Sequence, residues 1–155
     1  MSSFKIIQLS EKPIPEKEHI SGSDVYDDEL FNMESDWGGD TLEYEDEIDD
    51  IASSFEEVAD IDKDAHTITF KDKDTIKEIL REHVRKCCDR FMKNTAEGRW
   101  STAEYSLRSE ITEPCGIDDL LHIGYCKKAS TVLADYIAGH HPQTMHIGAI
   151  LYAHI

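Results

Sequence analysis

Several patterns that commonly identify a function are missing from this sequence of 155 residues. No apolar run approaches the roughly 20 residues that a membrane-spanning helix needs. The start of the chain lacks the apolar core and cleavage site of a secretory signal. No glycine-rich phosphate loop occurs, because Gly38 and Gly39 form an isolated pair. We therefore expect a cytoplasmic protein with no membrane span and no cofactor.

Cysteine is scarce, and the four cysteines are expected to be reduced thiols in the cytoplasm: Cys87, Cys88, Cys115 and Cys126. Cys115, His122 and Cys126 are the best candidates for a metal site, because thiolate and imidazole are the ligands that zinc prefers. A fourth ligand would have to come from elsewhere in the chain, with His140 and His141 as candidates. The spacing matches none of the common zinc motifs, and free cysteine is usually buried, so core packing is the better interpretation.

The remaining histidines and alternating acids do not complete a site either. His146 and His154 have the same parity on a proposed strand and lie eight residues apart, about 26 Å along an extended chain, so they cannot share one metal ion. Asp60, Asp62 and Asp64 alternate as in a calcium-binding loop. The glycine and glutamate that such a loop requires are replaced by Ala65 and Lys71.

Positive charge is rare in the first part of the chain. Residues 1–64 hold 21 Asp and Glu against four Lys and Arg, a net charge of 4 − 21 = −17, whereas residues 65–155 hold 12 of each sign. The excess lies almost entirely in residues 24–64. Such a charge argues against direct binding to nucleic acid or to an anionic membrane, and it permits a basic protein partner.

The acidic segment contains too many large apolar residues to be fully solvated, so we expect most of it to fold. They are Val25, Tyr26, Leu30, Phe31, Met33, Trp37, Leu42, Tyr44, Ile48, Ile51, Phe55 and Val58. Three explanations of the charge remain open. The segment is a solvated or partly disordered stretch, it packs against a basic helix at residues 72–94, or it presents carboxylates to a cationic partner.

The hydrophobic pattern predicts one α+β domain over residues 1–155, with an acidic half (24–64) and a neutral half (65–155). Its sheet is expected to be small and mostly antiparallel, with three or four strands that include the N- and C-terminal segments. Strands are predicted at 4–9, 58–70 (a hairpin) and 144–154, the last in a central position. Helices are predicted at 24–33, 44–57, 72–94, 101–111 and 118–138, with a break at Trp37–Asp40 and Gly124 as a candidate point of division in the last helix.

The predicted helix at 72–94 is the clearest element, because its apolar residues recur at helical spacing. We expect this stripe to face inward, with basic residues outside. Its members are Ile76, Ile79, Leu80, His83, Val84, Cys87, Cys88, Phe91 and Met92.

From these observations we predict a non-catalytic binding protein whose acidic face docks on a basic protein. In a sharper version of this prediction, the partner handles nucleic acid and the acidic face mimics the nucleic acid. In that version carboxylates about 6–7 Å apart along a strand replace phosphates in a positively charged groove. The candidate partner-binding residues are Asp27, Asp28, Glu29, Asp36, Trp37, Glu43, Glu45, Asp46, Glu47, Asp49 and Asp50. One alternative is a metal-binding protein or small enzyme using a Cys/His cluster in residues 115–146, and another is a structural or regulatory protein.

Overall fold

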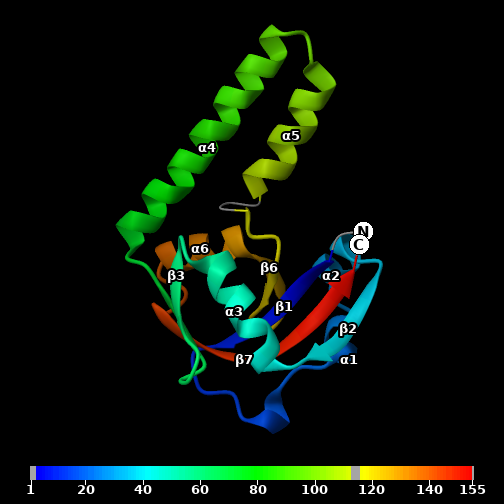
Figure 1. Ribbon diagram of the computed structural model, residues 1–155, viewed down its shortest axis with the longest axis vertical. Helices are drawn as coiled ribbons and strands as arrows, with labels where there is room; N and C mark the ends of the chain where they lie inside the picture. Colours follow the sequence, from blue (N-terminus) through cyan, green and yellow to red (C-terminus); the bar gives the residue numbers. More distant parts are fainter. Residues whose placement is uncertain (1–2, 113–115, 155) are drawn as a thin grey trace.

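The computed structural model describes residues 3–112 and 116–154, which form a mixed α+β domain with one open sheet between two groups of helices (Figure 1). The helices are α1 (Gly22–Val25), α2 (Glu29–Glu34), α3 (Tyr44–Phe55), α4 (Lys73–Ala96), α5 (Trp100–Thr112) and α6 (Ala129–Ile137), with a 3₁₀ turn at Glu16–Glu18. One face of the sheet packs against α3 and α6, and we call it the α3 face. The other packs against α1 and α2, and we call it the α2 face.

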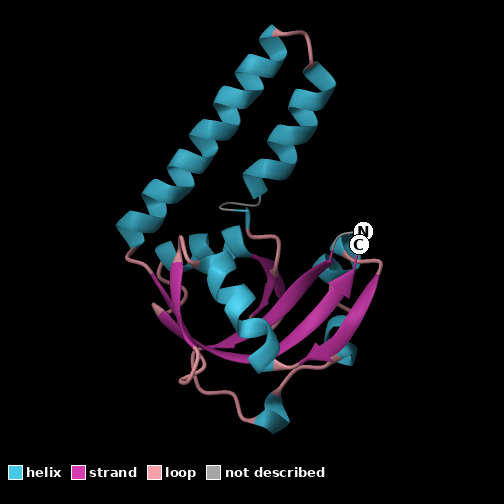
Figure 2. Cartoon of the chain, viewed as in Figure 1, coloured by secondary structure: helices cyan, strands magenta, loops and turns pink. Residues whose placement is uncertain are grey.

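The sheet has seven strands within the described residues, in the order β3-β4-β7-β1-β5-β6, with β2 paired to the remaining edge of β7 (Figure 2). Their bounds are β1 (Ser3–Ser10), β2 (Trp37–Leu42), β3 (Ala59–Asp62), β4 (Thr67–Phe70), β5 (Leu120–His122), β6 (Cys126–Lys128) and β7 (Thr144–His154). β1 and β5 are parallel, and the other pairs are antiparallel. The predicted class is therefore confirmed, whereas the expected three or four strands were too few.

The last strand, β7, is central as predicted, because β1 pairs with one of its edges and β4 and β2 share the other. A bulge interrupts its pairing with β1, so that Ile7 lies opposite Ile150 and Leu9 opposite Ile147. The bulge reverses the parity of the strand, since Met145, Ile147 and Ile150 all belong to the core on the α3 face. From strand parity alone we predicted that His146 and His154 lie on the same face of the sheet. This prediction is wrong, because the bulge lies between them and reverses the parity.

The side chain of Gln8 fills the bulge. Its Oε1 accepts hydrogen bonds from the backbone N–H of Ala149 (3.0 Å) and of Ile20 (3.1 Å), and its Nε2 donates to the carbonyl of Glu18 (2.9 Å). A Cβ on Gly148 would lie 2.5 Å from Gln8 Oε1, so a larger residue at that position would displace the Gln8 side chain. Gln8 therefore satisfies the unpaired bulge backbone and fastens the loop after β1 to the sheet.

Two of the missed strands lie where the sequence suggested helix. Residues 118–138 were expected to be helical, with Gly124 as a point of division, but β5 and β6 form a hairpin there and only α6 is helical. The turn of the hairpin contains Gly124 at φ +76°, which favours glycine. Pairing with β1 supplies the partner that a three-residue strand needs, and this long-range contact has no local signature.

The third missed strand, β2, occupies the expected break. Gly38 packs directly on β7, where a Cβ would lie 2.6 Å from the carbonyl oxygen of Tyr152, and Gly39 adopts φ +99°. The two glycines therefore allow close strand packing and a bulge rather than ending the structure. The helix expected at 24–33 is divided into α1 and α2.

Helices α4 and α5 form a hairpin that projects away from the sheet (Figure 1). Both were predicted, but the inward stripe on α4 is only partly covered. Ile76 and Cys87 are buried, whereas Cys88 is exposed and Val84 and Met92 are 43% and 66% exposed. Beyond its first turns α4 has α5 as its main neighbour, so a narrower strip of the helix is shielded. Among the described helices, none has the length and apolar character that a membrane span requires.

Candidate functional site

The outer surface of α3 carries a dense group of carboxylates on a firmly held helix. Ile48, Ile51 and Phe55 are at most 3% exposed and pack on the sheet, which fixes the orientation of the helix. The opposite side of α3 exposes four acids: Glu45, Asp46, Asp49 and Asp50. We call these four residues the α3 acidic surface.

Two acids on α3 already form ion pairs with lysines. Glu47 is half-buried and pairs with Lys5 at 3.3 Å, and Asp49 pairs with Lys63. Residues 40–64 contain 12 acids and Lys63 as their single cation. Across the described part of the chain, no ion pair joins Glu45, Asp46 or Asp50 to a basic side chain. These three carboxylates are therefore left to solvent or to a partner.

The charges on α3 are unfavourable for the helix itself. Glu45 and Asp49, and likewise Asp46 and Asp50, stand four residues apart, and like charges at this spacing destabilise a helix by about 0.2–0.5 kcal/mol per pair. Acids in the first turn do favour the helix dipole, but Asp49 and Asp50 lie beyond it, and no basic residue occupies the last turn. The number of carboxylates on α3 is therefore not explained by the stability of the helix.

The basic helix does not neutralise this surface. Arg81 pairs with Glu78 at 2.5 Å, and Arg85 pairs with Glu82 at 2.6 Å and with Asp89 at 2.7 Å, all within α4. The interpretation in which the acidic segment packs against the basic helix is therefore not supported by the ion pairs of Arg81 and Arg85.

The predicted partner-binding residues do not form a single surface. Asp27, Asp28 and Glu29 belong to the α1–α2 region, whose Val25 and Phe31 pack on the α2 face. Glu43 precedes α3, and the α3 acids lie on the opposite side of the sheet. A flat partner surface can contact one group or the other, and sequence proximity gave no sign of this division.

Asp28 has a structural role. Its Oδ1 accepts the N–H of Phe31 at 3.0 Å and caps α2, while its Oδ2 accepts the N–H of Cys126 at 2.7 Å. The carboxylate thereby joins α2 to β6. Both oxygens are engaged inside the protein, so Asp28 has less capacity to bind a partner than Asp27 or Glu29.

Trp37 lies at the start of β2, directly after Asp36, whose backbone N–H donates to the carbonyl of His154. The ring of Trp37 stacks on the ring of His154, with 5.0 Å between the ring centroids, and its centroid lies 5.6 Å from that of Tyr152. The bulge in β7 places these two residues on the α3 face, so Trp37 lies on that face as well. It remains 53% exposed.

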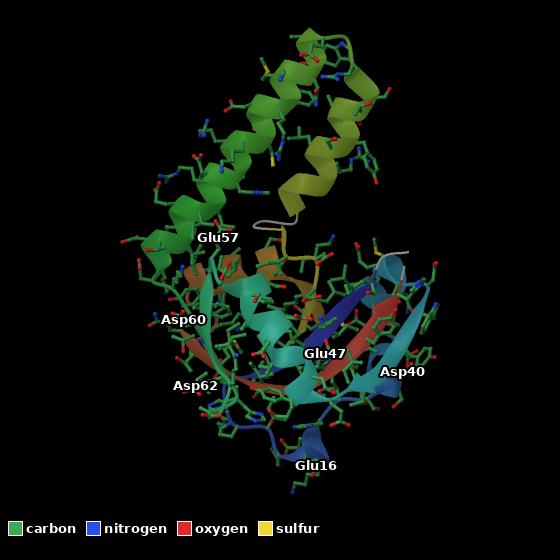
Figure 3. All side chains as sticks on the ribbon, viewed as in Figure 1. Glu16, Asp40, Glu47, Glu57, Asp60 and Asp62 are labelled. Carbon is green, nitrogen blue, oxygen red and sulfur yellow. The ribbon has the colours of Figure 1, made fainter. Side chains whose placement is uncertain are left out.

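Other carboxylates that the prediction left out extend around the molecule. Asp40 lies on β2, whereas Asp60 and Asp62 lie on the edge strand β3 at the other side of the domain (Figure 3). Ala59 and Ile61 pack on the α3 face, so the alternation of the strand places Asp60 and Asp62 on the opposite face. Exposed carboxylates on an edge strand also discourage pairing with another chain.

The Cys/His region does not bring its side chains together as metal ligands among the residues described. His122 and Cys126 are directly paired in the β5–β6 hairpin, and Cys115 lies outside the described residues. His141 instead faces Asp135 at 3.7 Å. No group of three or more His, Cys, Asp or Glu side chains within 3–112 and 116–154 converges on a common point.

The electrostatics of this pair oppose nucleophilic chemistry. Burial, reinforced by Asp28, raises the pKa of Cys126 to about 12, so the group stays a neutral thiol. Burial also lowers the pKa of His122, despite the nearby carboxylates of Asp28 and Asp24. The alternative of an enzyme or metal protein based on residues 115–146 therefore gains no support from these side chains.

Comparisons with known proteins add no assignment: no family model matches the chain, and no similar curated protein or solved structure was found. The functional argument therefore depends on the geometry and charge described above.

Proposed function

We propose that this chain is a non-catalytic binding protein that docks its α3 acidic surface on a basic surface of another protein. The observation that carries the proposal is a set of exposed carboxylates on α3, Glu45, Asp46 and Asp50, which form no ion pair with a lysine or arginine in the part of the chain that the structure describes. Their mutual repulsion would be relieved by a cationic partner, and the buried side of the helix holds them in place. Electrostatic complementarity of this kind increases association rate and specificity.

The sharper version of the proposal is nucleic-acid mimicry. The rise of an α-helix separates Glu45 from Asp49, and Asp46 from Asp50, by about 6 Å along the helix axis. A spacing of this size supports the mimicry version, in which carboxylates about 6–7 Å apart along a strand replace phosphates. A groove that binds a nucleic-acid backbone would accept such a row of charges, and the partner would then be a protein that handles DNA or RNA.

A capture experiment with matched charge variants tests the proposal. Wild-type protein is immobilised and compared with the α3 variant Glu45→Gln, Asp46→Asn, Asp50→Asn. A control variant, Glu11→Gln, Glu16→Gln, Glu18→Gln, neutralises three exposed acids in the loop after β1. Both variants change the net charge from −17 to −14, so non-specific attraction changes equally.

We expect basic proteins from a bacterial lysate to bind the wild type and the control at low salt, and to be lost from the α3 variant. Raising the salt should release them, because contacts between exposed charges are screened. Retention of the same proteins by all three forms would overturn the proposal. Competition with duplex DNA separates the two versions: mimicry requires that DNA displaces the bound protein, whereas simple docking does not.

A further inference from the structure

A shallow groove of about 490 Å³ lies between α2 and the turn that joins β5 to β6, and its lining is mostly apolar. Two large apolar side chains in it are open to solvent, since Met33 is 73% and Tyr125 59% exposed. Apolar and acidic groups together line the groove: Leu30, Met33, Tyr125, Asp27, Asp28 and Glu29. An occupant that matches this lining needs an apolar part and a positive charge.

The carboxylates of the groove differ in their capacity to bind a partner. Asp28 is engaged with the backbone of α2 and β6, as described above. Asp27 and Glu29 are exposed, and among the described residues no basic side chain forms an ion pair with either. Two negative charges therefore lie beside an apolar surface without an internal counter-charge.

The lysines closest in sequence to the groove already form ion pairs with other acids. Lys127 pairs with Asp135 at 3.1 Å, and Lys128 pairs with Glu34 at 3.2 Å. The Nζ of Lys127 also lies 4.8 Å from the centroid of the Tyr125 ring, a distance typical of a cation–π contact. The environment of this ring therefore already accommodates a positive charge.

We propose that this groove receives an arginine side chain of a basic protein partner. The aliphatic stem of arginine packs against Leu30 and Met33, while the planar guanidinium contacts the Tyr125 ring and donates to the carboxylates of Asp27 and Glu29. Arginine fits better than lysine because its flat, weakly hydrated head group stacks on aromatic rings and binds carboxylates through two N–H groups. The groove is associated with α2, so it is separate from the α3 acidic surface.

Methionine methyl groups offer a direct test with wild-type protein. The probe is a penta-arginine peptide added to protein labelled with ¹³C at the methionine methyls, and signals are assigned with Met→Leu variants. Met33 lies in the groove, whereas Met92, of similar exposure at 66%, lies on the projecting α4 and serves as an internal control. We expect the Met33 signal to shift in a saturable way, with little change at Met92 and little effect of penta-citrulline, the neutral analogue.

Variants that leave the net charge unchanged distinguish the groove from general attraction to an acidic protein. Tyr125→Ser should weaken penta-arginine binding about two- to five-fold, the range expected for loss of one exposed cation–π contact, and Tyr125→Phe should retain it. The matched control Tyr105→Ser changes a 76% exposed tyrosine on α5 and should have no effect. Neutralising the groove with Asp27→Asn and Glu29→Gln, which does change the net charge, should also weaken binding.

Three results would overturn the inference: equal shifts at Met33 and Met92, an equal response to penta-citrulline, or penta-lysine binding as tight as penta-arginine. The proposed function is tested separately. The α3 variant should keep the Met33 shift even if it loses its lysate partners, and the Tyr125→Ser variant should keep those partners that dock on α3 alone.

Discussion

The substitution Asp28→Ala removes a carboxylate that connects two distant parts of the chain. Its Oδ1 accepts the N–H of Phe31 and its Oδ2 accepts the N–H of Cys126, 98 residues away in sequence. The first contact caps α2, and the second holds β6 against that helix. Loss of Asp28 should therefore loosen the α2 side of the domain as well as remove a charge.

The magnitude follows from the two contacts. Replacement of an N-cap aspartate by alanine costs about 1 kcal/mol. A hydrogen bond from a backbone N–H to a charged group contributes about 1.5–3 kcal/mol, and alanine would leave the N–H of Cys126 without this acceptor. Because one side chain makes both contacts the terms are not strictly additive, and we expect a loss of about 2–4 kcal/mol in the free energy of unfolding.

Urea denaturation followed by circular dichroism measures this loss. Asp27→Ala and Glu29→Ala are matched controls, since each removes one negative charge from a neighbouring exposed position. Both should stay within about 1 kcal/mol of the wild type. Asp28→Asn should be intermediate, because its single amide oxygen retains an acceptor for one of the two N–H groups. If Asp28→Ala were no less stable than the two controls, the structural role of Asp28 would be refuted.

Two further predictions concern the sheet. Gln8→Leu should destabilise the protein by about 1–3 kcal/mol, because the N–H of Ala149 loses its acceptor. Gln143→Leu removes one hydrogen bond from an exposed side chain to the carbonyl of Phe70 and should cost less, so equal urea midpoints would contradict the assignment. The lowered pKa of His122 means that the unfolded state binds a proton more readily. Stability should therefore fall as the pH decreases from about 7.5 to about 5.5, through the ordinary histidine range. His122→Gln should reduce this dependence, and a wild-type-like slope in the variant would count against it.

Local patterns were sufficient for many elements. The period of the apolar residues predicted α3 from Ile48, Ile51 and Phe55. It also predicted the helix at 72–94 that corresponds to α4, whose start is capped in the structure by Asp72, which accepts the N–H of Thr75 at 2.9 Å. The long apolar segment at 144–154 also predicted a central strand. In each case the signal lies within the element itself, so no knowledge of distant contacts was needed.

Elements that depend on distant partners were missed. β5 exists because it pairs with β1, and β2 exists because Gly38 lets it approach Tyr152 and Ala153. The same limitation affected the candidate site: Asp28 was grouped with the α3 acids although its partner, Cys126, lies 98 residues further along the chain. The groove beside Tyr125 was not foreseen, because α2 and the β5–β6 turn meet only in the folded protein.

The sequence by itself determined the charge of this protein, its concentration in residues 24–64 and the amphipathic character of α3, because these are properties of composition and short-range periodicity. Only the tertiary structure decided which carboxylates face the same direction. The sheet divides the acids of α1 and α2 from those of α3, and the bulge in β7 reverses the faces of its side chains. Both effects arise from pairing and packing between segments far apart in the chain, where a local pattern carries no information.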